Sequence, residues 1–116
     1  MEKILASSKS AGAEAIAFDG LTVWITNSDS NSVTKLTASD GSTLGTFPVG
    51  LTPSGIVVDG QSMLITNYRS STIMKMRVSD GTVLGTFPTG SEPLVPAFDG
   101  AIIWIPNSEG NSVSKM

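Results

Sequence analysis

A repeat of 40 residues constrains the fold of this chain more than any other feature of its sequence. The pair Asp-Gly recurs at this interval, at positions 19–20, 59–60 and 99–100. Residues 51–90 are identical to residues 11–50 at 17 of 40 positions, and residues 91–116 are identical to residues 11–36 at 12 of 26. The spacing has no insertion or deletion, so we infer a tandem duplication of one structural unit.

Each unit contains four segments that are expected to form β-strands. In the first unit these are residues 15–18, 22–26, 32–37 and 42–47, separated by turns rich in Gly, Asn, Ser and Asp. Asp19-Gly20 predicts a tight hairpin with positive φ at both central residues. Val23-Trp24-Ile25 is apolar without alternation, which indicates a strand buried on both faces. Four short antiparallel strands in about 40 residues are typical of a β-propeller blade; a β-sandwich or a β-solenoid is the alternative.

We therefore expect an all-β protein, a β-propeller with three four-stranded blades per chain. Residues 11–50 would form blade 1, residues 51–90 blade 2, and residues 91–116 the first three strands of blade 3. Residues 1–10 align one period earlier with residues 41–50 and are expected to supply a closing fourth strand. The whole chain, residues 1–116, would then be a single half-propeller unit.

Three blades are fewer than the four to eight of known propellers. We therefore expect a homodimer that closes as a six-bladed ring, with strand exchange in which each N-terminal strand completes the third blade of the partner. An open arc would leave a bare strand edge and bare apolar sheet faces. The alternative is that the sequence is a fragment of a longer propeller.

Composition excludes several classes of function. The net charge is −3, which argues against nucleic acid, because phosphate binding needs a basic surface. The chain has no Cys and no His, and so lacks the commonest metal ligands and the commonest general base. No apolar run approaches the roughly 18 residues that span a membrane. We expect a soluble, cytoplasmic protein with no signal peptide, no cofactor and no membrane partner. Charged residues make up 15% of the chain, which fits a surface covered by a partner or one rich in Ser, Thr and Asn.

The candidate ligand-binding residues lie where the second strand of each unit ends. Asn recurs there at positions 27, 67 and 107, that is, Asn27, Asn67 and Asn107. Tyr68 and Arg69 follow Asn67, at positions where the other two units have a Ser and an acidic residue. Tyr and Arg are enriched in binding hot spots, and the loops after second strands form one rim of a propeller. The alternative for the asparagines is a structural role in the turn.

Other recurring residues are expected to have structural roles. Three carboxylates precede Gly and are expected to form turns rather than a metal site: Asp19, Asp59 and Asp99. Three lysines on the third strands are expected to be solvated: Lys35, Lys75 and Lys115. The two tryptophans are expected in the core between blades: Trp24 and Trp104. No Ser lies in a nucleophile motif with a base partner, so no catalytic residue is assigned.

A family resemblance adds to this reading. Residues 18–28, then residues 31–36 and then residues 40–50 resemble the YVTN-type and NHL-like repeats and the blades of virginiamycin B lyase-like propellers. The resemblance covers essentially the whole chain and implies a propeller fold. It also implies a catalytic His and a bound divalent cation in the lyases, but this sequence has no His that could take that role.

Three functions are open at this point. The favoured one is a non-enzymatic propeller that binds a small molecule, a sugar or a protein at its rim or central channel. The second is a purely structural, minimal propeller unit. The third is a metal-dependent lyase or hydrolase related to the lyase-like propellers.

Overall fold

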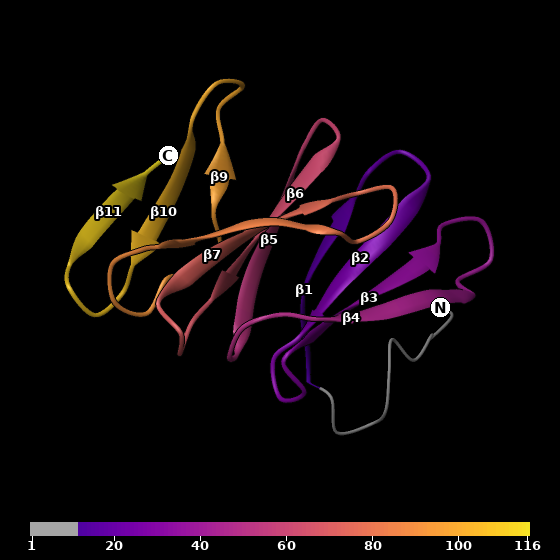
Figure 1. Ribbon diagram of the computed structural model, residues 1–116, viewed down its shortest axis with the longest axis horizontal. Helices are drawn as coiled ribbons and strands as arrows, with labels where there is room; N and C mark the ends of the chain where they lie inside the picture. The colour runs from indigo at the N-terminus through magenta and orange to yellow at the C-terminus, as the bar shows by residue number, and fades with distance from the viewer. Residues whose placement is uncertain (1–11) are drawn as a thin grey trace.

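The computed structural model describes residues 12–116, which form three antiparallel sheets (Figure 1). The first sheet consists of β1 (Ala13–Phe18), β2 (Thr22–Asn27), β3 (Ser32–Thr37) and β4 (Thr43–Pro48). The second consists of β5 (Pro53–Asp59), β6 (Ser62–Asn67), β7 (Thr72–Arg77) and β8 (Val83–Pro88). The third consists of β9 (Ala97–Phe98), β10 (Ile103–Asn107) and β11 (Ser112–Lys115).

Each sheet is an up-and-down meander in which neighbouring strands along the chain are paired. The prediction of four strands is confirmed for the first two sheets, and three strands are present in the third. The fourth strand expected from residues 1–10 lies outside the described residues. The described part of the chain contains no helix with the length and hydrophobicity needed to cross a membrane.

The Asp-Gly turns differ from their predicted geometry. Gly20 and Gly100 have φ of +101° and +99°, but Asp19 and Asp99 are not among the residues with positive φ. The Asp19 carboxylate instead accepts the backbone N–H groups of Leu21 and Thr22, at 2.9 and 2.7 Å. The prediction of positive φ at both Asp and Gly is therefore wrong: of the pair, only Gly is in the left-handed region, and the carboxylate of Asp19 accepts the amides of the turn.

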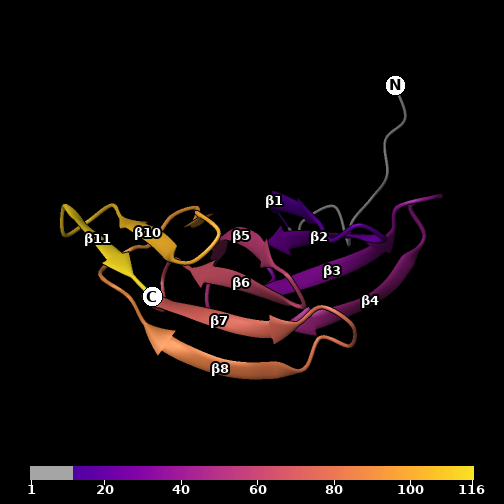
Figure 2. The same cartoon turned by 90° about the horizontal axis from the view of Figure 1, so that it is seen from above.

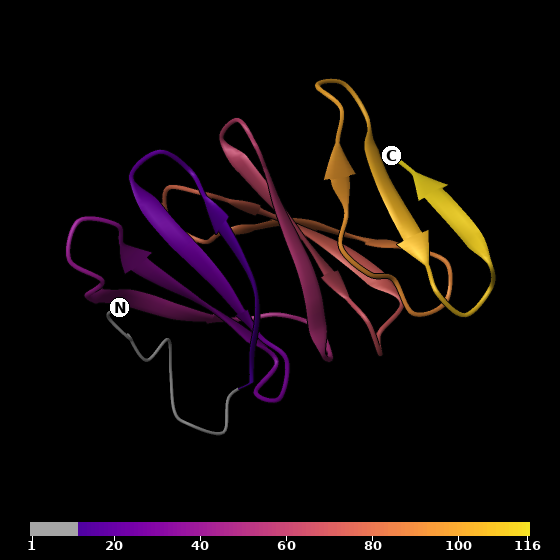
Figure 3. The same cartoon turned by 180° about the vertical axis from the view of Figure 1, so that it is seen from behind.

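The three sheets follow one another as an arc (Figures 2 and 3). Their first strands lie together on one side, where β1 contacts β5 and β5 contacts β9. The fourth strands, β4 and β8, lie on the far side of the arc (Figure 2). This arrangement leaves one face of the first sheet and one face of the third sheet without a neighbouring sheet in the described part of this chain.

The core lies between the sheets rather than inside any one of them. Trp24 and Val33 of the first sheet pack against four residues of the second sheet: Ile56, Met63, Ile65 and Met76. On its other face the second sheet packs against the third through a second cluster: Leu64, Ile73, Ile103 and Ile105. Met63, Leu64 and Ile65 are 0%, 2% and 0% exposed, so β6 is buried on both faces. The sequence predicts the same burial for Val23-Trp24-Ile25 of β2, but there Val23 and Ile25 are half-buried, because the first sheet has a neighbouring sheet on one face within the described chain.

The close approach of the second and third sheets predicts a sensitive glycine. A Cβ on Gly55 would lie 2.6 Å from the Cα of Val95 and 2.8 Å from Cδ of Pro96. We expect Gly55→Ala to lower the free energy of unfolding by about 1–3 kcal/mol through overpacking, measured by urea unfolding at fixed protein concentration. Gly110→Ala is the control, because its Cβ would meet only Ser112 Oγ, at 3.5 Å. Equal stability of the two variants would contradict this packing.

Candidate functional site

One rim of the arc is formed by the loops after the second strands and by the connections between sheets. We call it the loop rim. At each connection a residue in the left-handed region presents its carbonyl to the neighbouring loop: Gly12, Thr52 and Glu92. These carbonyls accept the backbone N–H groups of Ser28, Tyr68 and Ser108, at 2.8, 2.8 and 3.0 Å. The repeated contact ties every loop to the connection that precedes its sheet.

The three candidate asparagines are buried within their own sheets. Asn27, Asn67 and Asn107 are 0%, 0% and 3% exposed. Each Nδ2 donates to hydroxyl groups of the following strand, as Asn27 does to Ser32 and Thr34, at 3.1 and 2.9 Å. Each Oδ1 is buried without a hydrogen-bond partner in the part of the chain that the structure describes. A role of these asparagines in ligand binding stays a prediction, whereas their role in pinning the third strand is visible.

Tyr68 and Arg69 lie on the loop rim, as the sequence predicts for that loop. The Tyr68 hydroxyl donates to a carboxylate oxygen of Glu92 at 2.7 Å, which links the second sheet to the connection leading to the third. This hydrogen bond to an anion is the main cause that raises the pKa of Tyr68. Arg69 is exposed, and its backbone N–H donates to the carbonyl of Leu51 at 3.2 Å. The contribution of these two side chains to binding stays a prediction.

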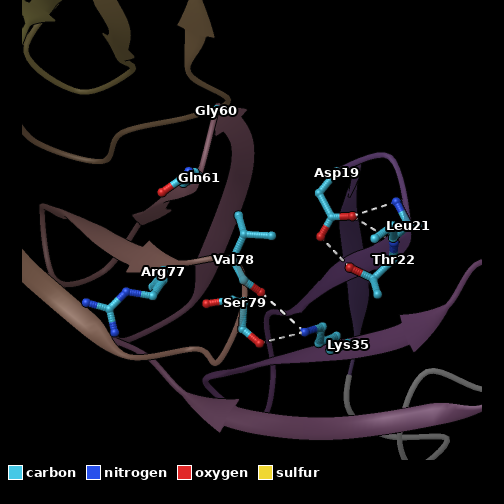
Figure 4. Close-up of a pocket in the computed structure, with 9 residues that line it drawn as sticks. All are labelled: Asp19, Leu21, Thr22, Lys35, Gly60, Gln61, Arg77, Val78 and Ser79. Carbon is cyan, nitrogen blue, oxygen red and sulfur yellow. Dashed lines mark hydrogen bonds between the residues drawn. The ribbon is translucent and has the colours of Figure 1, made fainter.

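The opposite rim carries a hollow of about 570 Å³ between the first and second sheets (Figure 4). Charged groups on its wall are Asp19, Lys35 and Arg77. Lys35 Nζ crosses from β3 and donates to the carbonyls of Val78 and Ser79, both at 3.2 Å. The same ammonium lies 5.2 Å from the centre of the Trp24 ring. The prediction of a solvated lysine is wrong for Lys35, because the neighbouring sheet supplies carbonyl acceptors that one unit alone does not reveal.

The Asp19 carboxylate on this wall accepts hydrogen bonds that hold its own turn together. It accepts from the backbone of Leu21 and Thr22, from the Thr22 hydroxyl, and from Trp24 Nε1 at 3.1 Å. Burial raises the pKa of Asp19, but these hydrogen bonds outweigh it and lower that pKa to about 2. Asp99 makes the same backbone contacts with its own turn and accepts from Trp104 Nε1. The prediction that the recurring carboxylates form turns is confirmed for these two.

The structure shows two exposed apolar flanks, one at each end of the arc, as the sequence predicts for an open arc of three blades. The first-sheet flank consists of Ile16, Phe18, Val23 and Ile25, with Ile16 67% and Phe18 61% exposed. The third-sheet flank consists of Val95, Trp104 and Val113, which are 57%, 38% and 64% exposed. The sequence assigned Trp104 to the core, but within one described chain it is not buried. The three repeats predict this difference, since the second sheet has a neighbouring sheet on both faces whereas the first and third sheets have one each.

Comparisons with known proteins support the fold and leave the function open. No protein-family model matches the sequence, and no curated protein sequence is significantly similar to it. Among solved structures, the chain is similar to hydrazine synthase from Kuenenia stuttgartiensis, with a TM-score of 0.85 and 20% identity over 100% of this chain and 35% of that one. It is also similar to a streptogramin B lyase, with a TM-score of 0.81 and 20% identity over 94% of this chain and 38% of that one.

A third similar structure is a catalytically inactive virginiamycin B lyase from Staphylococcus aureus with quinupristin. Its TM-score is 0.75 at 16% identity, over 94% of this chain and 42% of that one. The chain therefore spans less than half the length of the propellers it matches. At this identity the likeness shows the fold alone: the three sheets are successive blades of a β-propeller.

The hydrogen bonds of Asp19 predict a pH-dependent contribution to stability. Its pKa is about 2 in the folded chain, below the ordinary value of an aspartate, so its contribution is full above about pH 4 and is lost as the pH falls through 2. We expect Asp19→Asn to cost about 1 kcal/mol at pH 7 and less near pH 2, measured by urea unfolding at fixed protein concentration. Glu109→Gln, at an exposed loop position, is the control. A cost for Asp19→Asn that stays constant over this pH range would contradict the assignment.

Proposed function

We propose that this chain is a non-enzymatic β-propeller module whose three blades form half of a six-bladed ring completed by a second copy. In this proposal the ring is a scaffold whose loop rim, with Tyr68 and Arg69, binds a small molecule, a sugar or a protein. The observation that carries the proposal is the unequal burial of equivalent residues in three copies of one blade.

The second strand provides the clearest comparison. Trp24 is 0% exposed because the second sheet covers it, and Leu64 is 2% exposed because the third sheet covers it. Trp104 holds the same position in the third sheet and is 38% exposed. Its indole N–H already donates to Asp99 at 2.9 Å, as that of Trp24 does to Asp19 at 3.1 Å. Trp104 thus makes the same hydrogen bond as the buried Trp24 but has no neighbouring sheet over it. This difference supports a second copy that covers Trp104.

The exposed apolar side chains of the two flanks also favour a second copy on energetic grounds. Burying one large apolar side chain gains about 1.5–3 kcal/mol relative to leaving it exposed. Each flank has three or four such side chains, with Ile16 and Trp104 among them. Contiguous exposed apolar side chains mark interaction surfaces, so the two flanks support association with a second copy.

This proposal predicts the mass of the intact protein in solution. We expect light scattering on a size-exclusion column to give twice the mass of one chain. Trp104→Lys should shift the population to single chains, because the variant loses the indole that the second copy would cover and places an ammonium group at the interface. Leu84→Lys is the matched control, since Leu84 is 44% exposed although its sheet has a neighbour on both faces. A folded wild-type protein with the mass of one chain would contradict the proposed ring.

A further inference from the structure

The first-sheet flank contains a shallow apolar hollow of about 310 Å³. Its wall is formed by Ile16, Val23, Ile25 and Leu36, and its edge by the turn of residues 37–41. Nothing in the described part of the chain covers this hollow, and Ile16 is 67% exposed. The question is which side chain such a hollow accepts.

The second sheet has the equivalent surface, and there this surface is covered by a side chain of the first sheet. One period after the hollow residues come their counterparts: Ile56, Met63, Ile65 and Met76. All four belong to the buried cluster that packs around Trp24 of the first sheet. Their exposed fractions are 6%, 0%, 0% and 0%. The equivalent surface of the second sheet therefore binds a tryptophan of the preceding sheet, Trp24.

A matching tryptophan stands on the third-sheet flank. Trp104 is held by Asp99 as Trp24 is held by Asp19. Lys115 Nζ lies 5.9 Å from the Trp104 ring centre, as Lys35 Nζ lies 5.2 Å from that of Trp24. Val113, the counterpart of buried Val33, is 64% exposed beside it. The third-sheet flank therefore repeats the group of Trp, Asp and Lys that the first sheet presents to the second sheet. We call the tryptophan of this group the knob.

The lysine adds a polar contact with a defined target. Lys35 donates to the carbonyls of Val78 and Ser79 in the turn of the next sheet. One period earlier these positions are Ala38 and Ser39, in the turn at the edge of the hollow. Within residues 12–116, Lys115 Nζ has no hydrogen-bond acceptor and is exposed. The carbonyls of Ala38 and Ser39 are therefore candidate acceptors for Lys115 of a second copy.

We propose that Trp104 of one copy inserts into the hollow of a second copy, while Lys115 donates to the carbonyls of Ala38 and Ser39 in that copy. This inference rests on the proposed ring and identifies the residues at each interface between the two copies, which we call a seam. The contact is head-to-tail: the third-sheet flank of each chain meets the first-sheet flank of the other, and the ring contains two such seams. A seam between two third-sheet flanks is disfavoured, because it would bring two Lys115 ammonium groups together without acceptors.

Two variants that each lose one flank test the direction of the seam. Ile16→Glu places a charge in the hollow, and Trp104→Lys removes the knob. Each variant alone should be monomeric, with a dimer dissociation constant raised at least about 100-fold by the buried charge. An equimolar mixture should form mixed dimers, because one seam pairs two unaltered flanks and the other brings the introduced carboxylate and the introduced ammonium together as opposite charges. Native mass spectrometry identifies the mixed species.

The outcomes separate this inference from the proposed ring. A monomeric wild type overturns both. A dimeric wild type whose two variants are monomeric alone and stay monomeric when mixed overturns the head-to-tail seam and leaves the proposed dimer standing. Either variant remaining dimeric on its own also overturns the seam. Leu44→Glu is the control for Ile16→Glu and should stay dimeric, because its counterpart Leu84 remains 44% exposed beside a neighbouring sheet. Circular dichroism verifies that each monomeric variant is folded.

The lysine contact is tested separately. Lys115→Ala should raise the dimer dissociation constant about 100-fold, because the charged donor is lost at both seams and each loss corresponds to about tenfold. Lys75→Ala is the matched control, because Lys75 holds the same strand position in the second sheet, away from both flanks. Lys115→Arg should restore part of the affinity. Equal dissociation constants for the Lys115→Ala and Lys75→Ala variants would overturn the lysine contact.

Discussion

The structure depends on one constraint: the second strand of each blade is apolar on both faces, so a blade buries its apolar side chains only against neighbouring blades. The second sheet shows the constraint satisfied, since Met63 and Ile65 face the first sheet while Leu64 faces the third. Little of the core lies within a single sheet, so the hydrophobic energy belongs to the interfaces between sheets. The same constraint makes the two outer flanks the least satisfied surfaces of the described chain.

Much of the fold could be predicted from the repeat, because strand and turn signals are local. The strands of the first two units, the polar loops after the second strands, and the burial of Trp24 follow from residue type and spacing. The turn dihedrals did not follow, since the same Asp-Gly pair fits several turns and the hydrogen bonds of Asp19 select one. Those bonds also involve Trp24, five residues away.

The candidate site was less predictable, because its contacts join different units. Nothing in a single repeat shows that Lys35 reaches the carbonyls of the next sheet, 43 and 44 residues along the chain. The asparagines look like rim residues by position, yet Asn27 and Asn67 are wholly buried against hydroxyl groups of their own sheets. Tyr68 is the rim residue whose departure from the repeat does coincide with a contact between units, through Glu92.

The most direct test of this account is the solvent accessibility of the two tryptophans in the wild-type protein, measured by acrylamide quenching over a dilution series. Trp24 is sealed inside the chain and should resist quenching at every concentration. If the third-sheet flank is covered by a second copy, Trp104 should be protected at high concentration and become quenchable as dilution separates the chains. A Trp104 quenched equally at all concentrations, in protein that remains folded, would contradict the account.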